Sequence, residues 1–266
     1  MVISMKQVSW RRENKEILRN INWEVETGEN WAILGLNGSG KTTLLNILNG
    51  YIYPSSGEVK VLGKKFGSYS LQELRKSIGW VSSSLQENLY VNETVLEITL
   101  SGKFATIGLV DTPEEDDINK ARELLIKLGC SQLVERPYKT LSQGEKQKTV
   151  IARALMSSPK ILILDEPCTG LDILAKEHLL STIQKLSTEK DAPTLIYVTH
   201  RVEEILPVFN NVLMLRKGEV YQTGQTKKVL TSANLSDFFA APVEISWEYE
   251  RASLRLNNCG QMGIAL

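Results

Sequence analysis

The stretch Gly35-Leu36-Asn37-Gly38-Ser39-Gly40-Lys41-Thr42 is the most informative part of the sequence. It follows a short apolar run, residues 31–34, and precedes residues 43–49, whose pattern is helical. A buried strand that turns through glycines into a helix directs backbone N–H groups and the positive end of the helix dipole at one point. The complete G-x-x-x-x-G-K-[ST] spacing predicts that this point binds the phosphates of a nucleotide. A glycine-rich turn with an incidental lysine is the alternative, and the strand–helix context disfavours it.

Each residue type in this phosphate-binding loop has a chemical reason. Glycines let the backbone approach phosphate oxygens closely, and Lys41 supplies a positive charge to the β- and γ-phosphates. The Thr42 hydroxyl is placed to ligate Mg²⁺. The predicted nucleotide-binding residues of this stretch are Gly35, Asn37, Gly38, Ser39, Gly40, Lys41, Thr42 and Thr43.

A second candidate element is the apolar run of residues 161–164, which ends in Asp165 and Glu166. Adjacent acids at the end of a buried strand indicate a nearby cation, because unpaired charge is costly at low dielectric. Successive strand residues face opposite ways, so we expect the two carboxylates to have different roles. Asp165 is predicted to hold Mg²⁺, directly or through water, and Glu166 to polarise the attacking water as a general base. A solvated strand end is the alternative.

The pattern of the whole chain is that of an α/β protein. It predicts a P-loop NTPase core with a mainly parallel sheet, an N-terminal antiparallel β subdomain and a helical insert at about 88–140. Within the insert, Thr112 is the expected N-cap of a helix. From residue 143 onward the predicted helices and strands alternate in the order 143–157, 161–164, 173–187, 194–198, 202–207 and 211–215.

Composition limits the function classes. Among 266 residues, 31 Lys and Arg balance 31 Asp and Glu, and this zero net charge disfavours a protein that binds nucleic acid through bulk charge. The sequence contains neither an apolar stretch of the ~20 residues that a membrane-spanning helix needs nor a signal-peptide pattern. Cys130, Cys168 and Cys259 are widely spaced, which favours reduced thiols over a disulfide framework or a zinc site.

Three further motifs complete an ordered set. They are Leu141-Ser142-Gln143-Gly144-Glu145, Thr169-Gly170-Leu171-Asp172 and Val198-Thr199-His200. With these motifs and the phosphate-binding loop, roughly residues 1–230 resemble the ATP-binding subunit of the ABC transporter superfamily. On this resemblance the three motifs are, in order, the signature motif, the D-loop and the strand end that carries the switch histidine. Residues 231–266 then form a C-terminal tail of unknown role.

The signature residues Ser142, Gln143, Gly144 and Glu145 also have a local interpretation. Ser142-x-x-Glu145 has the spacing of a capping box, so we expect a helix to begin at Ser142. A helix N-terminus with a glycine can bind an anion, although a simple helix cap is the alternative. The resemblance implies that these residues close over the γ-phosphate bound by a second copy, and it identifies Asp172 as the D-loop residue. Two domains would then face head to tail with two ATP molecules between them.

The resemblance assigns catalysis to Glu166, His200 and Lys41. His200 follows an apolar β-run, and we expect it to hydrogen-bond the γ-phosphate and to orient Glu166 and the water. The chain's other histidine, His178, lies in a predicted helix and is expected to be solvated.

Two positions depart from the family pattern, and each leaves two candidates. The Q-loop glutamine is replaced by Ser83 in simple alignment, and the nearest glutamine is Gln86. For the residue that stacks on adenine, Trp10 is the aromatic candidate and Arg12 lies nearer the usual position. The run of residues 78–85 resembles the branch of the family associated with molybdate transport or photorepair, and we infer no substrate from it.

The resemblance implies a subunit that binds and hydrolyses ATP with Mg²⁺ and drives a separate integral membrane permease. Its expected partners are a second copy of itself, or a homologous ATPase domain, and that permease. Its expected location is cytoplasmic, peripheral on the inner face of the cell membrane. The alternative is a soluble, non-transport ABC ATPase acting on nucleic acid or ribosomes, which the neutral charge disfavours.

Overall fold

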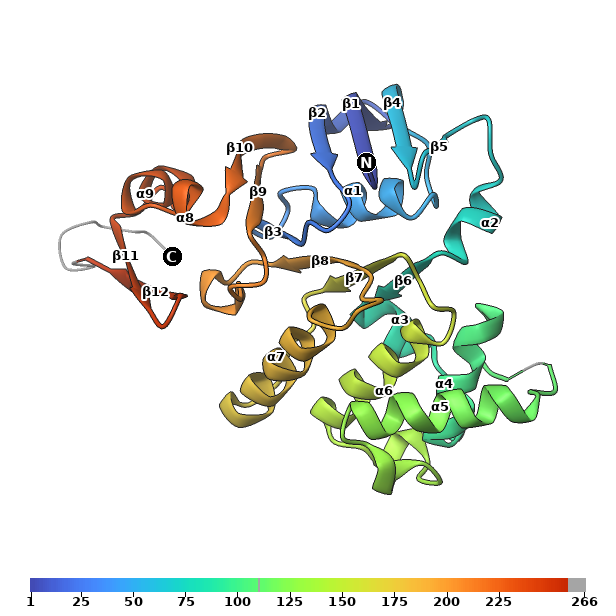
Figure 1. The fold of residues 1–266 in the computed structure, drawn as a ribbon. Helices are drawn as coiled ribbons and strands as arrows, with labels where there is room; N and C mark the ends of the chain where they lie inside the picture. Colours follow the sequence, from blue (N-terminus) through green and yellow to red (C-terminus); the bar gives the residue numbers. More distant parts are fainter. Residues whose placement is uncertain (110, 258–266) are drawn as a thin grey trace.

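A six-stranded sheet forms the centre of the molecule in the computed structural model, which describes residues 1–109 and 111–257 (Figure 1). In spatial order its strands are β10 (Glu219–Gln225), β9 (Asn211–Arg216), β3 (Trp31–Gly35), β8 (Thr194–Thr199), β7 (Ile161–Asp165) and β6 (Ile78–Val81). The strands from β9 to β6 are parallel, and β10 is antiparallel to β9. Strands β3 and β8 are buried along their whole length, as expected for a parallel sheet covered on both faces.

A second, antiparallel sheet covers one face of the first. Its strands in spatial order are β2 (Lys15–Val25), β1 (Ile3–Arg12), β4 (Ser56–Val61) and β5 (Lys64–Lys65). Helix α1 (Lys41–Leu48) lies between the two sheets in Figure 1, and its Leu44, Leu45, Ile47 and Leu48 are buried in the core that joins them. The start of α1, which belongs to the phosphate-binding loop, is therefore held from both sides by hydrophobic packing.

A group of helices forms the insert. It comprises α3 (Ser83–Asn88), α4 (Val95–Phe104), α5 (Glu115–Lys127), the short turns η1 (Ser131–Leu133) and η2 (Tyr138–Thr140), and α6 (Gln143–Leu155), and α2 (Leu71–Arg75) precedes it. Helices α4 and α6 cross so closely that a Cβ on Gly102 would lie 1.9 Å from the Arg153 carbonyl oxygen. The Arg153 guanidinium, 8% exposed, donates to Ser101 Oγ at 3.1 Å and to the Thr106 carbonyl at 2.8 Å.

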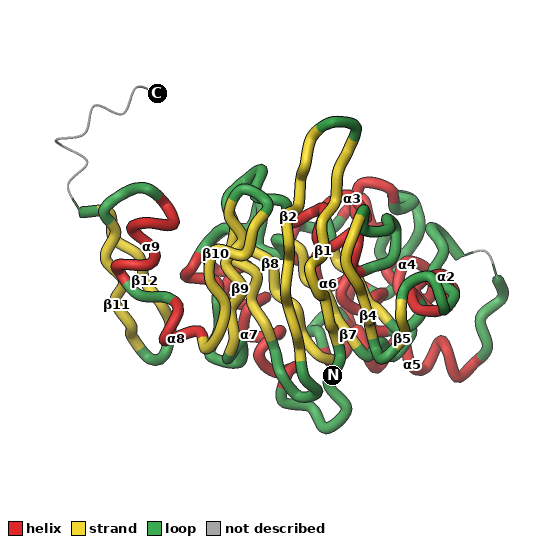
Figure 2. The backbone as a smooth tube through the Cα atoms, turned by 90° about the horizontal axis from the view of Figure 1, so that it is seen from above, coloured by secondary structure: helices red, strands yellow, loops and turns green. Residues whose placement is uncertain are grey.

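The other face of the central sheet carries α7 (Ile173–Ser187), and the remaining elements lie toward the β10 end of the molecule (Figure 1). These are η3 (Val202–Glu204), α8 (Thr226–Val229), α9 (Ser232–Phe239), β11 (Val243–Glu248) and β12 (Arg251–Leu256). Figure 2 shows α9 and the β11–β12 hairpin together at one end of the molecule, beyond β10. Val243 and Ala252 are buried in the same hydrophobic core as α7 and β8.

The predicted fold class is confirmed, and two local predictions were wrong. The expected helix at 202–207 is only the single turn η3, because Pro207 lacks the N–H that would continue a helix. The N-cap of α5 is Glu114 and not Thr112, since Glu114 and Asp117 form the reciprocal capping box. Within the segment 231–266, residues 231–257 contain α9 and the hairpin, and residues 258–266, with Cys259, lie outside the described residues.

Candidate active site

The phosphate-binding loop adopts the backbone that its glycines were expected to permit. Gly38 and Gly40 have φ values of 75° and 106°, in the left-handed region, and Gly40 is the N-cap of α1. At Gly35 the reason for glycine is space, because a Cβ there would lie 2.5 Å from Ser39 Oγ and 2.9 Å from the Leu215 carbonyl oxygen. Larger residues at Gly35 would therefore push the loop away from the sheet.

Glu166 turns away from the line of strand β7. Its φ is 48°, and its N–H donates to the Val198 carbonyl on β8 at 2.9 Å. This left-handed backbone ends the alternation of the strand, so Asp165 and Glu166 both line the cavity around the phosphate-binding loop. The expectation that the two carboxylates face opposite ways was wrong for this reason.

Glu166 contacts both other predicted catalytic residues through one oxygen. Its Oε1 lies 3.2 Å from Lys41 Nζ and 3.3 Å from His200 Nδ1. The contact with His200 lacks the alignment of a hydrogen bond. Lys41 is 7% exposed and also donates to the carbonyls of Gly35 at 2.7 Å and Leu36 at 3.3 Å. Three residues from β3–α1, the end of β7 and the end of β8 thus meet where the sheet ends.

Asp165 is half-buried beside this group. Burial, with the adjacent charge of Glu166, raises the pKa of Asp165 to about 6, and Lys41 only partly opposes this. A carboxylate in such a place is stabilised by any further cation that reaches it.

These groups surround a cavity of about 720 Å³. Its wall contains the whole turn of residues 36–43, both carboxylates, residues 82–84 and, from β2, Lys15 and Ile17. Sequence reasoning missed Lys15 and Ile17, because no motif marks the strand that the tertiary fold brings over the loop.

The residues present fit a phosphate chain and a divalent cation. The Ser39 hydroxyl is buried in the loop without a hydrogen-bond partner, as expected of a group that binds a phosphate oxygen. Thr42 is exposed at the start of α1 and lines the same cavity as Asp165, so a hydroxyl and a carboxylate face one space.

The structure shows where the two candidates for adenine stacking and the two candidates for the Q-loop residue lie. Neither Trp10 nor Arg12 lines this cavity: Trp10 packs against the core between the sheets, and Arg12 is exposed near the tip of the β1–β2 hairpin. Of the Q-loop candidates, Ser83 lines the cavity, whereas Gln86 accepts a hydrogen bond from the Gln143 side chain at 3.3 Å.

The signature residues lie at the start of α6, away from the lining of this cavity. Ser142 caps the helix as predicted, accepting from the Glu145 N–H at 3.3 Å, while Glu145 accepts from the Ser142 N–H at 2.8 Å. A Cβ on Gly144 would meet Ala175 at 3.4 Å, so the signature helix adjoins the start of α7. There Asp172 is exposed and caps α7 through the Ala175 N–H at 2.8 Å, and His178 is exposed as expected.

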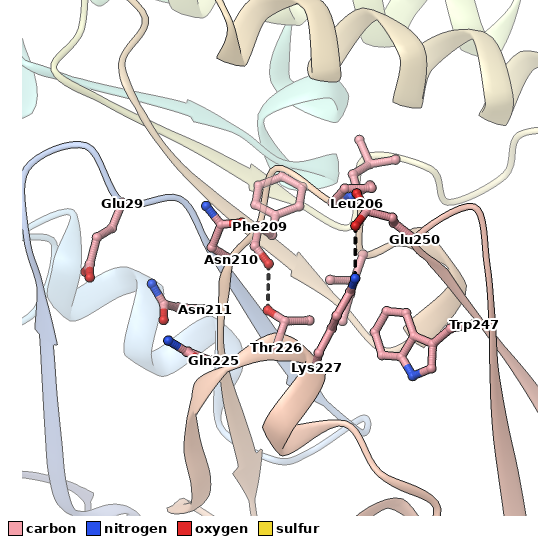
Figure 3. Close-up of a pocket in the computed structure, with 12 residues that line it drawn as sticks. Glu29, Leu206, Phe209, Asn210, Asn211, Gln225, Thr226, Lys227, Trp247 and Glu250 are labelled. Carbon is pink, nitrogen blue, oxygen red and sulfur yellow. Dashed lines mark hydrogen bonds and ion pairs between the residues drawn. The ribbon is translucent and has the colours of Figure 1, made fainter.

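A second cavity, of about 490 Å³, is lined in part by the segment of residues 205–211 (Figure 3). Leu206 and Phe209 of that segment border it, and Trp247 and Glu250 of the C-terminal hairpin face them. None of the residues predicted from the motifs lines this cavity. Within residues 1–109 and 111–257, no helix combines the length and the apolar character needed to cross a bilayer.

Comparisons with known proteins agree with these observations. The profile of the family described as "ABC transporter" matches residues 18–169. An uncharacterised ABC transporter ATP-binding protein of Bacillus subtilis, YlmA, is 50% identical over 255 residues, which are 96% of this chain and 97% of the relative.

Solved structures show the same fold at lower identity. The cbiO1 structure from Clostridium perfringens, described as part of the ABC transporter complex cbiONQ, has a TM-score of 0.76 at 28% identity and covers 89% of this chain and 93% of its own. The dimeric structure of a bacterial ABC transporter cassette has a TM-score of 0.72 at 29% identity, covering 85% and 99%. With the phosphate-binding loop, the acidic strand end and the capped signature helix in place, the chain belongs to the ABC transporter ATP-binding family.

Proposed function

We propose that this chain hydrolyses ATP at the cavity between the phosphate-binding loop and the end of β7. The observation that carries the proposal is that Glu166, which lines this cavity with Lys41, has its Oε1 within 3.3 Å of both Lys41 Nζ and His200 Nδ1. A carboxylate in this position can accept a proton from water that attacks the γ-phosphate, and His200 can orient it. Lys41 leaves its pairing with Glu166 to bind phosphate oxygens, which frees Glu166 for the water.

Thr42 and Asp165 are the residues that would hold Mg²⁺. When bound, the ion neutralises charge that develops on the phosphate oxygens. Two ligands from the protein are few, but Mg²⁺ is usually completed by substrate phosphates and water. Ser39 and the N–H groups of the turn hold the phosphates, and Ser83 faces the same space.

The kinetic test compares the chain's two histidines. We expect His200→Ala to lower kcat for ATP about 100-fold or more while His178→Ala leaves it unchanged, because only His200 contacts Glu166. Glu166→Gln is expected to lose hydrolysis but retain ATP binding, measured by filter retention of labelled nucleotide. Normal turnover in both Glu166→Gln and His200→Ala would remove the chemical basis of the proposal.

We further propose that two copies form a head-to-tail dimer around two ATP molecules. The signature residues lie outside the lining of the chain's own phosphate cavity, although their helix start suits an anion. Beside them, Ile173 and Leu174 are 75% and 72% exposed at the start of α7. Adjacent large apolar side chains at this exposure favour contact with a partner. The solved cassette similar to this chain is itself dimeric.

The membrane permease is proposed to dock in a groove of about 330 Å³ between the core and the helical insert. The ring centroids of Tyr51 and Trp80 lie 5.6 Å apart there at an interplanar angle of 43°, and Arg75 Cζ lies 5.1 Å from the Tyr51 ring centroid. The Trp80 indole N–H is buried without a hydrogen-bond partner. An exposed aromatic side chain such as Tyr51 suits a protein partner. This docking would place the chain on the cytoplasmic face of the membrane and couple ATP hydrolysis to transport.

Tyr51 and Tyr53 make a matched pair for testing the docking, since each is 58% exposed and only Tyr51 lines the groove. We expect Tyr51→Ala to reduce co-purification of the chain with a membrane protein at least fivefold, because interface aromatics carry much of the binding energy. Tyr53→Ala should leave it unchanged. Equal loss in both variants would show that the groove is not the docking site.

A further inference from the structure

The C-terminal hairpin is joined to the segment after His200 through Arg251. The Arg251 Nη2 group donates to the backbone carbonyl of Glu203, in η3, at 3.0 Å. The same guanidinium makes two hydrogen bonds to the carboxylate of Glu177 on α7. One side chain thus connects β12, η3 and α7, and η3 begins two residues after His200.

The pairing of Arg251 with Glu177 has a defined geometry. A guanidinium that donates two bonds to one carboxylate restricts both side chains more than a single contact does. The hydrogen bonds from Arg251 lower the pKa of Glu177, so the carboxylate remains ionised at neutral pH. Glu177 belongs to the helix that Asp172 caps, and the contact therefore relates the D-loop helix to the segment after His200.

The inner side of η3 is held by a different residue, Glu204. Glu204 is 4% exposed, and its carboxylate accepts hydrogen bonds from Thr199 Oγ1 at 2.7 Å and Tyr197 OH at 3.2 Å, both on β8. The turn is thus attached to the sheet from within by Glu204 and to the hairpin from outside by Arg251. In the chain, His200 lies between β8 and this turn.

The chain beyond η3 packs into the hydrophobic core, where Leu206 and Phe209 are 3% and 1% exposed, and it also borders a cavity. Leu206 and Phe209 line the 490 Å³ cavity, and the hairpin forms its opposite wall (Figure 3). Side chains beside a cavity lose dispersion contacts on that side.

We propose that Arg251 is a positioning residue for ATP hydrolysis, which acts by bracing η3 so that His200 faces Glu166. The kinetic part of this inference rests on the proposed ATPase function, whereas the brace itself can be measured without turnover. Arg251 touches neither the phosphate-binding loop nor the carboxylates at the end of β7, so its effect is expected on kcat and not on ATP binding.

Arg251→Gln in the full chain tests the proposal by removing the guanidinium that bonds Glu177 and the Glu203 carbonyl. We expect backbone amides of residues 200–205 to exchange with solvent at least about tenfold faster, since local opening becomes easier. The kcat for ATP should fall about tenfold, with KM within about twofold, because small displacements of an orienting group lower the rate of the chemical step. Arg251→Lys keeps the positive charge but not the paired N–H donors of the guanidinium. It should therefore show a smaller rise in amide exchange and a smaller loss of kcat than Arg251→Gln.

Lys227→Ala is the matched control. Lys227 of α8 forms an ion pair at 2.9 Å with Glu250, in the turn of the hairpin (Figure 3). This pair also attaches the hairpin to the rest of the chain, but through α8 and not through η3. Its loss should change neither the exchange of residues 200–205 nor kcat. An equal effect of Lys227→Ala would show that general loosening of the hairpin, and not the brace on η3, is responsible.

A double-variant comparison separates positioning from stability. If Arg251 acts through His200, Arg251→Gln should lower kcat no further when His200 is already alanine. The same fractional loss in the His200→Ala background, or unchanged exchange in Arg251→Gln alone, would overturn the proposal.

If Arg251→Gln fails to fold, Glu177→Gln, which leaves Arg251 in place, gives the same readouts. Absence of ATPase activity in the natural chain would contradict the proposed function, while the exchange measurement would still decide whether Arg251 braces η3.

Discussion

At the scale of single residues, the backbone conformation of Glu166 determines which way its carboxylate faces. A φ of 48° is uncommon for a residue other than glycine, and the hydrogen bond from the Glu166 N–H to the Val198 carbonyl maintains this conformation. The consequence is that both carboxylates face one cavity. Sequence alternation could not predict this, because the strand ends one residue earlier, at Asp165.

Asp165 leads to a prediction about stability. Its pKa rises from 3.8 in the unfolded chain to about 6 in the folded protein, so the folded state binds more protons between these values. The contribution of Asp165 to stability is therefore complete below pH 4 and is lost as the pH rises through 6. We expect Asp165→Asn to be more stable than the natural chain by about 3 kcal/mol at pH 7.5, without nucleotide, and by little at pH 4.

Urea unfolding at a series of pH values measures this difference. The exposed Asp191 provides a control, and Asp191→Asn should show no such rise with pH. A stability difference for Asp165→Asn that is the same at pH 4.5 and pH 7.5 would contradict the assigned environment of Asp165.

At the scale of elements, the crossing of α4 and α6 positions the signature helix. The crossing depends on Gly102, where a Cβ would lie 1.9 Å from backbone. Gly102→Ala must separate the helices, and we expect a loss of about 1–3 kcal/mol in the free energy of unfolding. Gly144→Ala on α6 meets only an ordinary contact at 3.4 Å and should retain stability, as measured by the same denaturant titration. Comparable losses in the two variants would argue against the close crossing as the cause.

Elements that occupy one continuous stretch were predictable from the sequence. The phosphate-binding loop, the buried strand β7 and the capped start of α6 each carry their signal within a few residues. The capping box of α5 was misplaced because Thr112-Pro113 offers a competing local start, and Glu114 with Asp117 is the pair that forms. The hairpin β11–β12 was missed although both of its strands alternate apolar and polar residues. Only Val243 and Ala252 of these strands are deeply buried.

The whole molecule brings together residues that no local pattern connects. Lys15 and Ile17 reach the phosphate cavity, and Arg251 reaches Glu177 across 74 positions, only because the sheets and α7 stack in this order. Trp10 and Arg12 were candidates on linear spacing alone, and the fold places neither in the cavity wall. Contacts of this kind depend on tertiary packing, which a single sequence does not display.

At the scale of the whole molecule, we propose that two chains share their ATP sites. Each chain presents a complete phosphate cavity and, outside its lining, a capped helix start with the exposed pair Ile173 and Leu174. Closing two such surfaces head to tail would bury that pair and bring Ser142 to the partner's γ-phosphate.

The most direct measurement is the molar mass of Glu166→Gln by light scattering, with and without Mg²⁺ and ATP. The chain of 29.8 kDa is expected to double in mass when ATP is added, because blocked hydrolysis holds the closed state. Adding Ser142→Arg to this variant should leave the mass at that of one chain, since the bulky charged side chain would obstruct the helix start. If Glu166→Gln stays at the mass of one chain in saturating ATP while hydrolysing it normally, the shared-site mechanism is wrong.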